Sequence, residues 1–240
     1  MIRIGTSGWI YKHWRGIYYP ERLPQKDWFG HYARDFDTVE INNTFYRLPP
    51  VETFENWGKV APPGFVFTFK ASRYLTHIKR LNDPAESLEN FIGRARAAEA
   101  SLGPVLYQLP PSFKVDMARL EAFLQALPRD LTHVFEFRHA SWYAGEVRDL
   151  LARYGIAFAI HDHGQAPGCP EWVTSGTVYL RFHGSPEAPY SGSYSDDRLR
   201  ETARKIEAWT GRGLNVFAYF NNDIGGHAVR NALTLKRLLR

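Results

Sequence analysis

Two glutamates, Glu40 and Glu136, are the residues whose types and positions point most directly to chemistry. Each alternates with apolar residues at a spacing of two, in the segments 39–41 and 135–137, which is typical of a β-strand that presents the carboxylate on one face. A carboxylate inside a protein is costly unless it is paired or coordinated. The pair therefore predicts an acid and a base, a glycosidase couple, or ligands of a divalent ion. The alternative is a structural ion network with neighbouring cations.

Basic side chains occupy the same kind of position. Lys70 ends a strand-like segment and is suited to forming a Schiff base, holding an anionic group, or serving as counter-ion to a glutamate. Arg138 and Arg181 offer guanidinium groups, which bind phosphate or carboxylate through two parallel hydrogen bonds. His183, two residues after Arg181, is predicted to be an acid–base group or a metal ligand, with a packed core histidine as the alternative.

The segment 161–163, His-Asp-His, is the compact cluster that most resembles a metal site. Adjacent residues of a strand point in opposite directions, so the three side chains cannot all face one ion unless the strand has already ended. We predict Asp162 as a site residue and leave the two histidines open, because the parity of segment 157–161 is ambiguous. Glu136, Asp162 and His183 form the candidate ligand set for one divalent ion; a site without metal is the alternative.

Neutral and aromatic side chains near strand ends and in loops are predicted to orient a ligand or to stack on it. Amides orient a ligand without adding charge, and aromatic rings stack on bases or sugars. The alternatives are a capped turn for the two asparagines and packing under long loops for the rings. The predicted substrate-binding residues are Ser7, Trp9, Asn42, Tyr46, Gln108, Trp142, Asn221 and Asn222, together with Arg138 and Arg181.

Eight strand-like segments, alternating with helix-like ones, are expected to position these residues. The strands are expected at 2–6, 37–42, 65–70, 104–109, 133–138, 156–161, 177–183 and 215–221. The helices are expected at 26–36, 51–60, 84–101, 117–127, 141–154, 199–210 and 226–239, with Asp116 and Ser141 as N-caps and 162–176 as a loop. Helices between strands imply a parallel sheet covered by helices, so the polar strand faces must look into a barrel. We predict an α/β fold, a single (β/α)8 TIM-type barrel domain over residues 1–240, with an open doubly wound sheet as the alternative.

Composition limits the classes of protein to consider. The net charge of +5 and the pI near 9.3 mildly favour an anionic partner. A single cysteine, Cys169, excludes an intramolecular disulfide, and no apolar run approaches the ~18 residues of a membrane span. The chain starts directly with a strand-like segment, so we expect no signal peptide, a cytoplasmic location and no membrane partner. The sequence lacks a Walker loop, HExxH, CxxC and GxSxG.

A set of motifs resembles the YecE-like family, a domain of unknown function. The motifs are Gly5-Thr6-Ser7-Gly8-Trp9, Glu40-Ile41-Asn42-Asn43-Thr44-Phe45-Tyr46, Phe69-Lys70 with Thr76-His77, Gln108-Leu109-Pro110-Pro111-Ser112-Phe113, Glu136-Phe137-Arg138-His139 with Ser141-Trp142, Arg181-Phe182-His183-Gly184 and Tyr219-Phe220-Asn221-Asn222. They run in order along nearly the whole chain. The resemblance implies a β/α barrel and supplies no activity.

The expected barrel is also similar to that of the endonuclease IV and sugar-isomerase group, in which Glu, Asp and His at strand ends hold metal ions. Glu136, Asp162 and His183 fall on the strands where that group places ligands. The third and fourth strands instead end in Lys70 and Gln108, where endonuclease IV has histidines. The resemblance therefore implies one ion or none rather than a trinuclear zinc site.

Three functions follow as hypotheses. The first is an enzyme, endonuclease-like or another phosphoesterase, that acts on a phosphate-containing substrate by hydrolysis or acid–base chemistry, with Glu136 as general base or ligand. The second is a metal-free carbohydrate or small-metabolite enzyme that uses Glu40 and Glu136, which a carboxylate locked by two arginines would count against. The third is a non-catalytic module that binds nucleic acid or an anionic small molecule. The sequence does not determine the oligomeric state.

Overall fold

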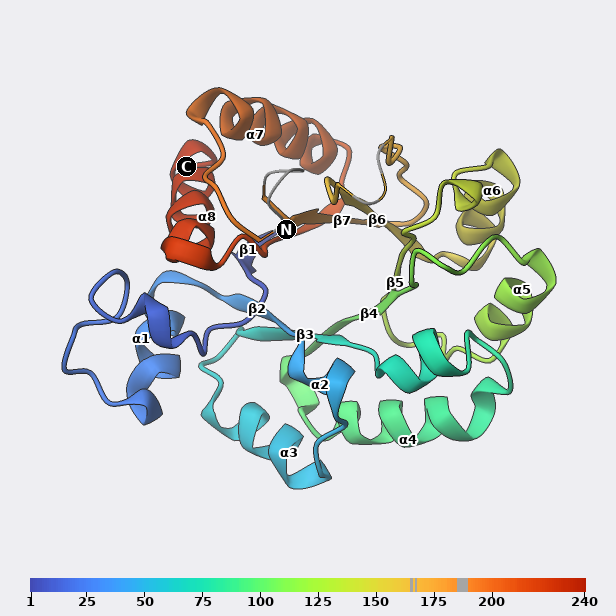
Figure 1. The fold of residues 1–240 in the computed structure, drawn as a ribbon, viewed down its shortest axis with the longest axis horizontal. Helices are drawn as coiled ribbons and strands as arrows, with labels where there is room; N and C mark the ends of the chain where they lie inside the picture. Colours follow the sequence, from blue (N-terminus) through green and yellow to red (C-terminus); the bar gives the residue numbers. More distant parts are fainter. Residues whose placement is uncertain (165, 167, 185–189) are drawn as a thin grey trace.

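A computed structural model describes residues 1–164, 166, 168–184 and 190–240. Eight parallel strands form one ring-shaped sheet with the helices on its outside (Figure 1). The strands are β1 Ile2–Thr6, β2 Thr38–Ile41, β3 Val66–Lys70, β4 Leu102–Gln108, β5 His133–Glu136, β6 Ala157–His161, β7 Thr177–Phe182 and β8 Asn215–Phe220. The helices are α1 Trp28–Asp35, α2 Asn43–Tyr46, α3 Val51–Val60, α4 Pro84–Arg96, α5 Met117–Gln125, α6 Gly145–Tyr154, α7 Asp196–Gly211 and α8 His227–Leu238.

The TIM-type barrel is confirmed. The sheet order β1-β8-β7-β6-β5-β4-β3-β2 keeps neighbours in chain order, which excludes the open doubly wound sheet, whose strand order reverses. All eight expected strands are present, with ends shifted by at most two residues. No helix among the described residues combines the length and the apolar character needed to cross a bilayer.

Several local expectations change in the structure. Asp116 caps α5 as predicted, accepting a hydrogen bond from the Arg119 amide at 3.0 Å. Ser141 was wrong as an N-cap, because it lies in the short turn Ala140–Trp142 and its Oγ accepts from the Val115 amide instead. The helix expected over 84–101 ends at Arg96, and α2 had not been expected. Between β6 and β7 the described residues form no helix, as expected; residues 165 and 167 of that loop lie outside the description.

The alternation of strand side chains builds two separate packing layers. Inward-facing residues form a cluster inside the barrel: Leu106, Val134, Ala157, Ala159, Tyr179, Phe217 and Tyr219. The alternate residues, among them Phe67, Phe69, Phe135, Phe137 and Phe220, belong to the larger core between sheet and helices. Tyr219 crosses the interior, and its hydroxyl lies 2.6 Å from the Thr38 hydroxyl and 2.8 Å from the Thr68 hydroxyl. Polar groups therefore enter the barrel interior below the site.

The ring is completed between β1 and β2 without a strand ladder in the described residues. Tyr32 of α1 bridges the two strands: its hydroxyl accepts from the Thr6 amide and donates to the Thr38 carbonyl, both at 3.0 Å. A Cβ on Gly5 would lie 2.3 Å from the Thr38 carbonyl oxygen, so the strands approach too closely there for any larger residue. One tyrosine hydroxyl thus replaces the missing ladder bonds at this point.

Tyr32→Phe should lower the free energy of unfolding by about 1–3 kcal/mol, because it leaves a buried amide and a buried carbonyl without this partner. Tyr18→Phe is the matched control, since its hydroxyl donates to Asp35 at the exposed surface (3.0 Å). Urea denaturation of both variants provides the measurement. An effect of Tyr32→Phe no larger than that of Tyr18→Phe would contradict the bridging role.

Candidate functional site

Five polar side chains close the C-terminal end of the barrel. Glu40, Lys70, Gln108, Glu136 and Arg181 lie at or near the ends of β2, β3, β4, β5 and β7, and all five are buried. Gln108 is in register with Glu136, so these side chains sit at the same height. The two-residue period that places Leu106 and Val134 inside the barrel also directs Gln108 and Glu136 inward.

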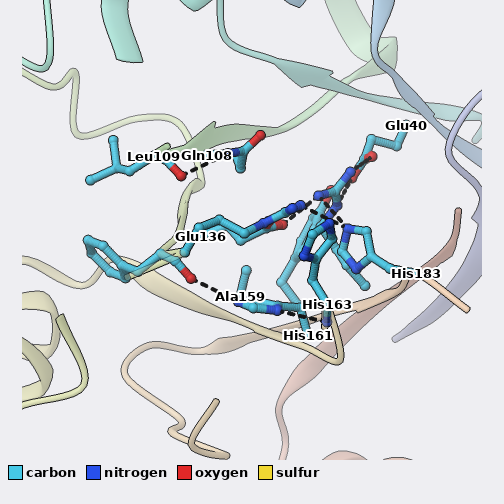
Figure 2. A network of polar contacts seen from close by, with 12 residues as sticks. Glu40, Gln108, Leu109, Glu136, Ala159, His161, His163 and His183 are labelled. Carbon is cyan, nitrogen blue, oxygen red and sulfur yellow. Dashed lines mark hydrogen bonds and ion pairs between the residues drawn. The ribbon is translucent and has the colours of Figure 1, made fainter. Parts of the chain in front are cut away.

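Arg181 is the centre of this cluster. Its guanidinium holds Glu40 with two hydrogen bonds, Nε to Oε2 at 3.0 Å and Nη2 to Oε1 at 2.6 Å. Its remaining amino group, Nη1, donates to Oε2 of Glu136. Tyr179 Oη donates to Glu40 Oε2 at 2.6 Å. Figure 2 shows Glu40 and Glu136 on either side of this network.

A second guanidinium, that of Arg138, binds the same Glu136 carboxylate. Its Nε donates to Oε1 of Glu136, while its Nη2 and the Nη1 of Arg181 each lie 3.1 Å from Nε2 of His183. Guanidinium groups only donate hydrogen bonds, so Nε2 accepts and we assign the proton of His183 to Nδ1. Burial and the charge of Arg181 lower the pKa of His183 well below its usual value, which keeps the ring neutral.

Both carboxylates remain ionised despite full burial. Burial alone would raise the pKa of Glu136, but Arg138 and Arg181 hold it well below its usual value. The same opposition, with Arg181 as the main cation, lowers the pKa of Glu40. In turn, the two glutamates outweigh burial and raise the pKa of Arg181 well above its usual range. Neither glutamate is therefore available to exchange a proton near neutral pH.

This geometry counts against two roles expected for the glutamates. A general base at Glu136 needs a free oxygen, yet both oxygens accept from arginines. A Glu40–Glu136 glycosidase couple needs one carboxyl with a raised pKa, whereas both pKa values are lowered. A carboxylate held by two arginines argues against a glycosidase couple, and Glu136 is held in this way. The structural ion network describes the two glutamates better.

Asp162 acts on the backbone rather than on the barrel interior. Its Oδ1 accepts from the His183 amide at 2.7 Å and its Oδ2 from the Tyr194 hydroxyl at 2.6 Å. His161, which sequence left open, shares the inward parity of Ala157 and Ala159. Its Nε2 lies 2.9 Å from the carbonyl oxygen of Phe137. Asp162 therefore orients the loop that carries His183.

The candidate metal ligands Glu136, Asp162 and His183 do not converge as a set of three in the described structure, although His183 Nδ1 lies 3.8 Å from Asp162 Oδ1. Arginines, a backbone amide and a tyrosine hydroxyl already occupy the donor atoms of the two carboxylates, and two guanidinium groups face Nε2 of His183. Within the described part of the chain, no group of three or more His, Cys, Asp or Glu side chains is placed to hold a metal ion. We derive no chemical step through a metal.

Lys70 is the charged group that this network leaves without a partner. Its ammonium lies 4.2 Å from the centre of the Phe45 ring, and among the described residues it has no hydrogen-bond acceptor and no salt bridge. Burial, and next the charge of Arg181, lower the pKa of Lys70 to about 7; Glu136 and Glu40 offset only part of this. Lys70 therefore titrates much closer to neutral pH than an exposed lysine does.

Unpartnered polar atoms surround the same end of the barrel. Ser7 Oγ, Asn42 Oδ1, His183 Nδ1 and Asn222 Oδ1 are buried and form no hydrogen bond within the described residues. Ser7 Oγ is near enough to Glu40 to lower the pKa of that carboxyl, although it lies outside the geometry of a well-formed hydrogen bond. Buried polar atoms are usually satisfied, so these sites have the capacity to bind water or a polar ligand.

The other residues that were expected to bind a substrate differ in their burial and in their contacts. Trp9 and Trp142 are buried in the outer core, where Trp9 packs against Phe67 and Trp142 Nε1 donates to the Phe113 carbonyl. Tyr46 is exposed, at 73% of its surface. Gln108 Nε2 donates to the Leu109 carbonyl at 2.8 Å, Asn221 is half-buried after β8, and the Asn222 amide binds Gly192 O and Asn231 Oδ1.

Three contributors to the site escaped sequence reasoning: Phe45, His77 and Tyr179. The parity of β7 places Tyr179 two residues before Arg181, so the sequence did contain that signal. Phe45 and His77 come from α2 and from the turn Tyr74–Ile78, and their rings lie 4.8 Å apart. Burial, and next the charge of Lys70, lower the pKa of His77 to about 4. No sequence spacing links these two loops.

Comparison with known proteins identifies the family of this chain. A family model described as "Protein of unknown function DUF72" matches residues 3–240. The chain belongs to the DUF72 family. The resemblance expected from the motifs is thereby confirmed.

Two curated relatives carry UPF0759 names. The DUF72 chain is 26% identical over 271 residues to YunF of Bacillus subtilis strain 168, covering 100% of the chain and 95% of YunF. It is 31% identical over 157 residues to YecE of Escherichia coli K12, covering 64% of the chain and 54%, about half, of YecE.

Two solved structures share the barrel. A DUF72 protein of Thermotoga maritima MSB8 is similar with a TM-score of 0.89 and 32% identity, covering 100% of this chain and 99% of that one. A DUF72 protein of Enterococcus faecalis V583 reaches a TM-score of 0.84 at 23% identity, covering 100% and 95%, and supports the fold alone.

Arg181→Met should lower the free energy of unfolding by about 3–5 kcal/mol, because it leaves two buried carboxylates with one guanidinium between them. Arg96→Met is the control: Arg96 pairs with Asp130 at 2.8 Å on the surface, where such a pair contributes about 0–1 kcal/mol. Chemical denaturation measures both. Equal losses in the two variants would show that Arg181 is not the centre of the site.

Lys70→Met should change stability in a pH-dependent way. The pKa of Lys70 falls from its usual 10.5 to about 7 on folding, so between these values the unfolded chain holds more protons. From this group, wild-type stability rises with pH across that window by at most about 1.4 kcal/mol per pH unit. The variant should therefore gain more stability relative to wild type at pH 6 than at pH 9, as measured by urea denaturation. Lys59→Met, on the exposed surface of α3, controls for loss of a charge; a gain independent of pH would contradict the lowered pKa.

Proposed function

We propose that this protein is an enzyme that binds a phosphate-bearing small molecule at the C-terminal end of the barrel and acts on it by acid–base chemistry. The observation that carries the proposal is the position of Lys70, a buried lysine whose ammonium has no acceptor among the described residues, beside two carboxylates whose oxygens are paired with arginines. β/α barrels place their active sites at the C-terminal ends of their strands, where these side chains lie.

Charge at the site favours an anion. Three cations, Lys70, Arg138 and Arg181, face two carboxylates, Glu40 and Glu136, and the arginines occupy all four carboxylate oxygens. The Nη1 group of Arg138 has no hydrogen-bond partner among the described residues, and 7% of the residue is exposed. Lys70 and this amino group are therefore the donors left for a phosphate, which suits charge-assisted hydrogen bonds.

Different residues of the site are suited to different chemical roles. Lys70, with a pKa of about 7, is matched to proton transfer at neutral pH, where a general acid or base is most effective. The half-buried His77 and the buried His163, each with a pKa lowered to about 4 mainly by burial, are neutral imidazoles in the same electrostatic environment. Glu136, expected as the base, becomes the counter-ion that positions Arg138.

Titration calorimetry at pH 6 with inorganic phosphate, and with sulfate as an anion that does not titrate there, tests the binding site. Lys70→Met should weaken both anions about tenfold or more, since a hydrogen bond to a charged group contributes about 1.5–3 kcal/mol. Lys59→Met is the matched control, because Lys59 is exposed and pairs with Glu55. Equal affinity in both variants would overturn the site.

Turnover separates an enzyme from the binding module considered from sequence. Phosphate monoesters and sugar phosphates, offered to wild-type protein, should yield a product whose formation Lys70→Met abolishes and Lys59→Met preserves. Saturable phosphate binding with no turnover of any such compound would favour the module. Affinity that requires a single-stranded oligonucleotide would favour nucleic acid as its ligand.

A further inference from the structure

We infer that Lys70 is a nucleophile that forms an imine with the carbonyl carbon of an aldehyde or ketone carrying an anionic group. This inference rests on the proposed function, because the same positively charged site holds the anionic part of the substrate. It narrows the substrate class to anionic carbonyl compounds.

The contacts of Lys70 leave its amine free to react. Nζ packs over the Phe45 ring and has no acidic partner in the described chain, whereas three exposed or partly exposed lysines pair with carboxylates: Lys59 with Glu55, Lys79 with Asp83 and Lys205 with Glu171 and Glu201. A nucleophilic amine needs a lone pair that no proton or salt bridge occupies. With 8% of its surface exposed, Lys70 is largely desolvated.

The groups that face Lys70 favour its neutral form. Arg181 and Arg138 repel a proton on the amine, and the two glutamates that would attract one, Glu136 and Glu40, are already paired with these arginines. His77 adds no compensating negative charge, because an imidazole is neutral or cationic. A desolvated amine among cations is the environment known to activate lysine toward carbonyl groups.

The step balances without an external oxidant or reductant. The Lys70 lone pair attacks the carbonyl carbon, the C–O π bond opens, and one amine proton passes to the oxygen to give a neutral carbinolamine. The second amine proton then passes to the hydroxyl, which leaves as water while the nitrogen lone pair forms the C=N bond, so amine and carbonyl become imine and water.

His77 is placed to carry these protons. Its ring packs against the same Phe45 ring that Lys70 covers, with centroids 4.8 Å apart. Its Nδ1 lies 2.9 Å from the Thr76 hydroxyl, and the residue is half-buried. The Phe45 ring thus contacts both the amine of Lys70 and the imidazole of His77 at the barrel end.

Reductive trapping tests the inference on the whole protein. Glyoxylate, an anionic aldehyde, is incubated with the protein and cyanoborohydride at pH 7, and peptide mass spectrometry locates each added carboxymethyl group. Lys70 should be modified at least about tenfold faster than the exposed Lys59 in the same sample, because a lysine of ordinary pKa is almost fully protonated at this pH. Inorganic phosphate should slow modification of Lys70 and leave that of Lys59 unchanged.

The result separates this inference from the function on which it rests. Phosphate binding by the wild-type protein is measured in the same preparation, and in Lys70→Arg the labelling at position 70 should disappear because the variant has no primary amine there. If Lys70 reacts no faster than Lys59 in a protein that binds phosphate normally, the imine is overturned and the anion site stands. If neither labelling nor phosphate binding occurs, both are overturned.

Discussion

The bridge from Arg181 to Glu40 and Glu136 is the interaction on which the rest of the site depends. Full burial of these three charges is unfavourable unless each finds partners of good geometry. Arg181 meets that condition with a bidentate contact to one carboxylate and a further bond to the other, helped by Tyr179. The interaction connects β2, β5 and β7 across the barrel end. Its charges also influence the pKa values of Lys70 and His183.

Because both carboxylates are already paired with arginines, the other polar side chains at the barrel end are the groups available for chemistry. His183 becomes a neutral acceptor between two guanidinium groups, and Asp162 accepts a hydrogen bond from its backbone amide. Lys70 is a desolvated cation that has no counter-ion of its own among the described residues. In a low-dielectric interior, such an ammonium group either attracts an anion or loses its proton. The proposed binding of a phosphate-bearing molecule depends on the first outcome, and the proposed imine depends on the second.

Much of the fold followed from local patterns in the sequence. The strand-like segments of the sequence correspond to all eight strands, and Asp116 marked the start of α5, because these signals act over a few residues. Ser141 failed as a cap since its hydroxyl serves the Val115 amide of another loop. The inward face of β6 was ambiguous because a strand buried on both faces is apolar on both faces.

By itself, the sequence determined that Glu40, Lys70, Glu136, Arg138, Arg181 and His183 gather at one end of a barrel, because parallel strands of fixed alternation align their C-terminal residues. Their pairing, by contrast, depended on the tertiary structure. Glu40 and Arg181 are 141 residues apart, and their pairing depends on barrel closure, not on spacing. The depressed pKa of Lys70 likewise arises from burial and from neighbours on other strands, which act through distance in space rather than along the chain.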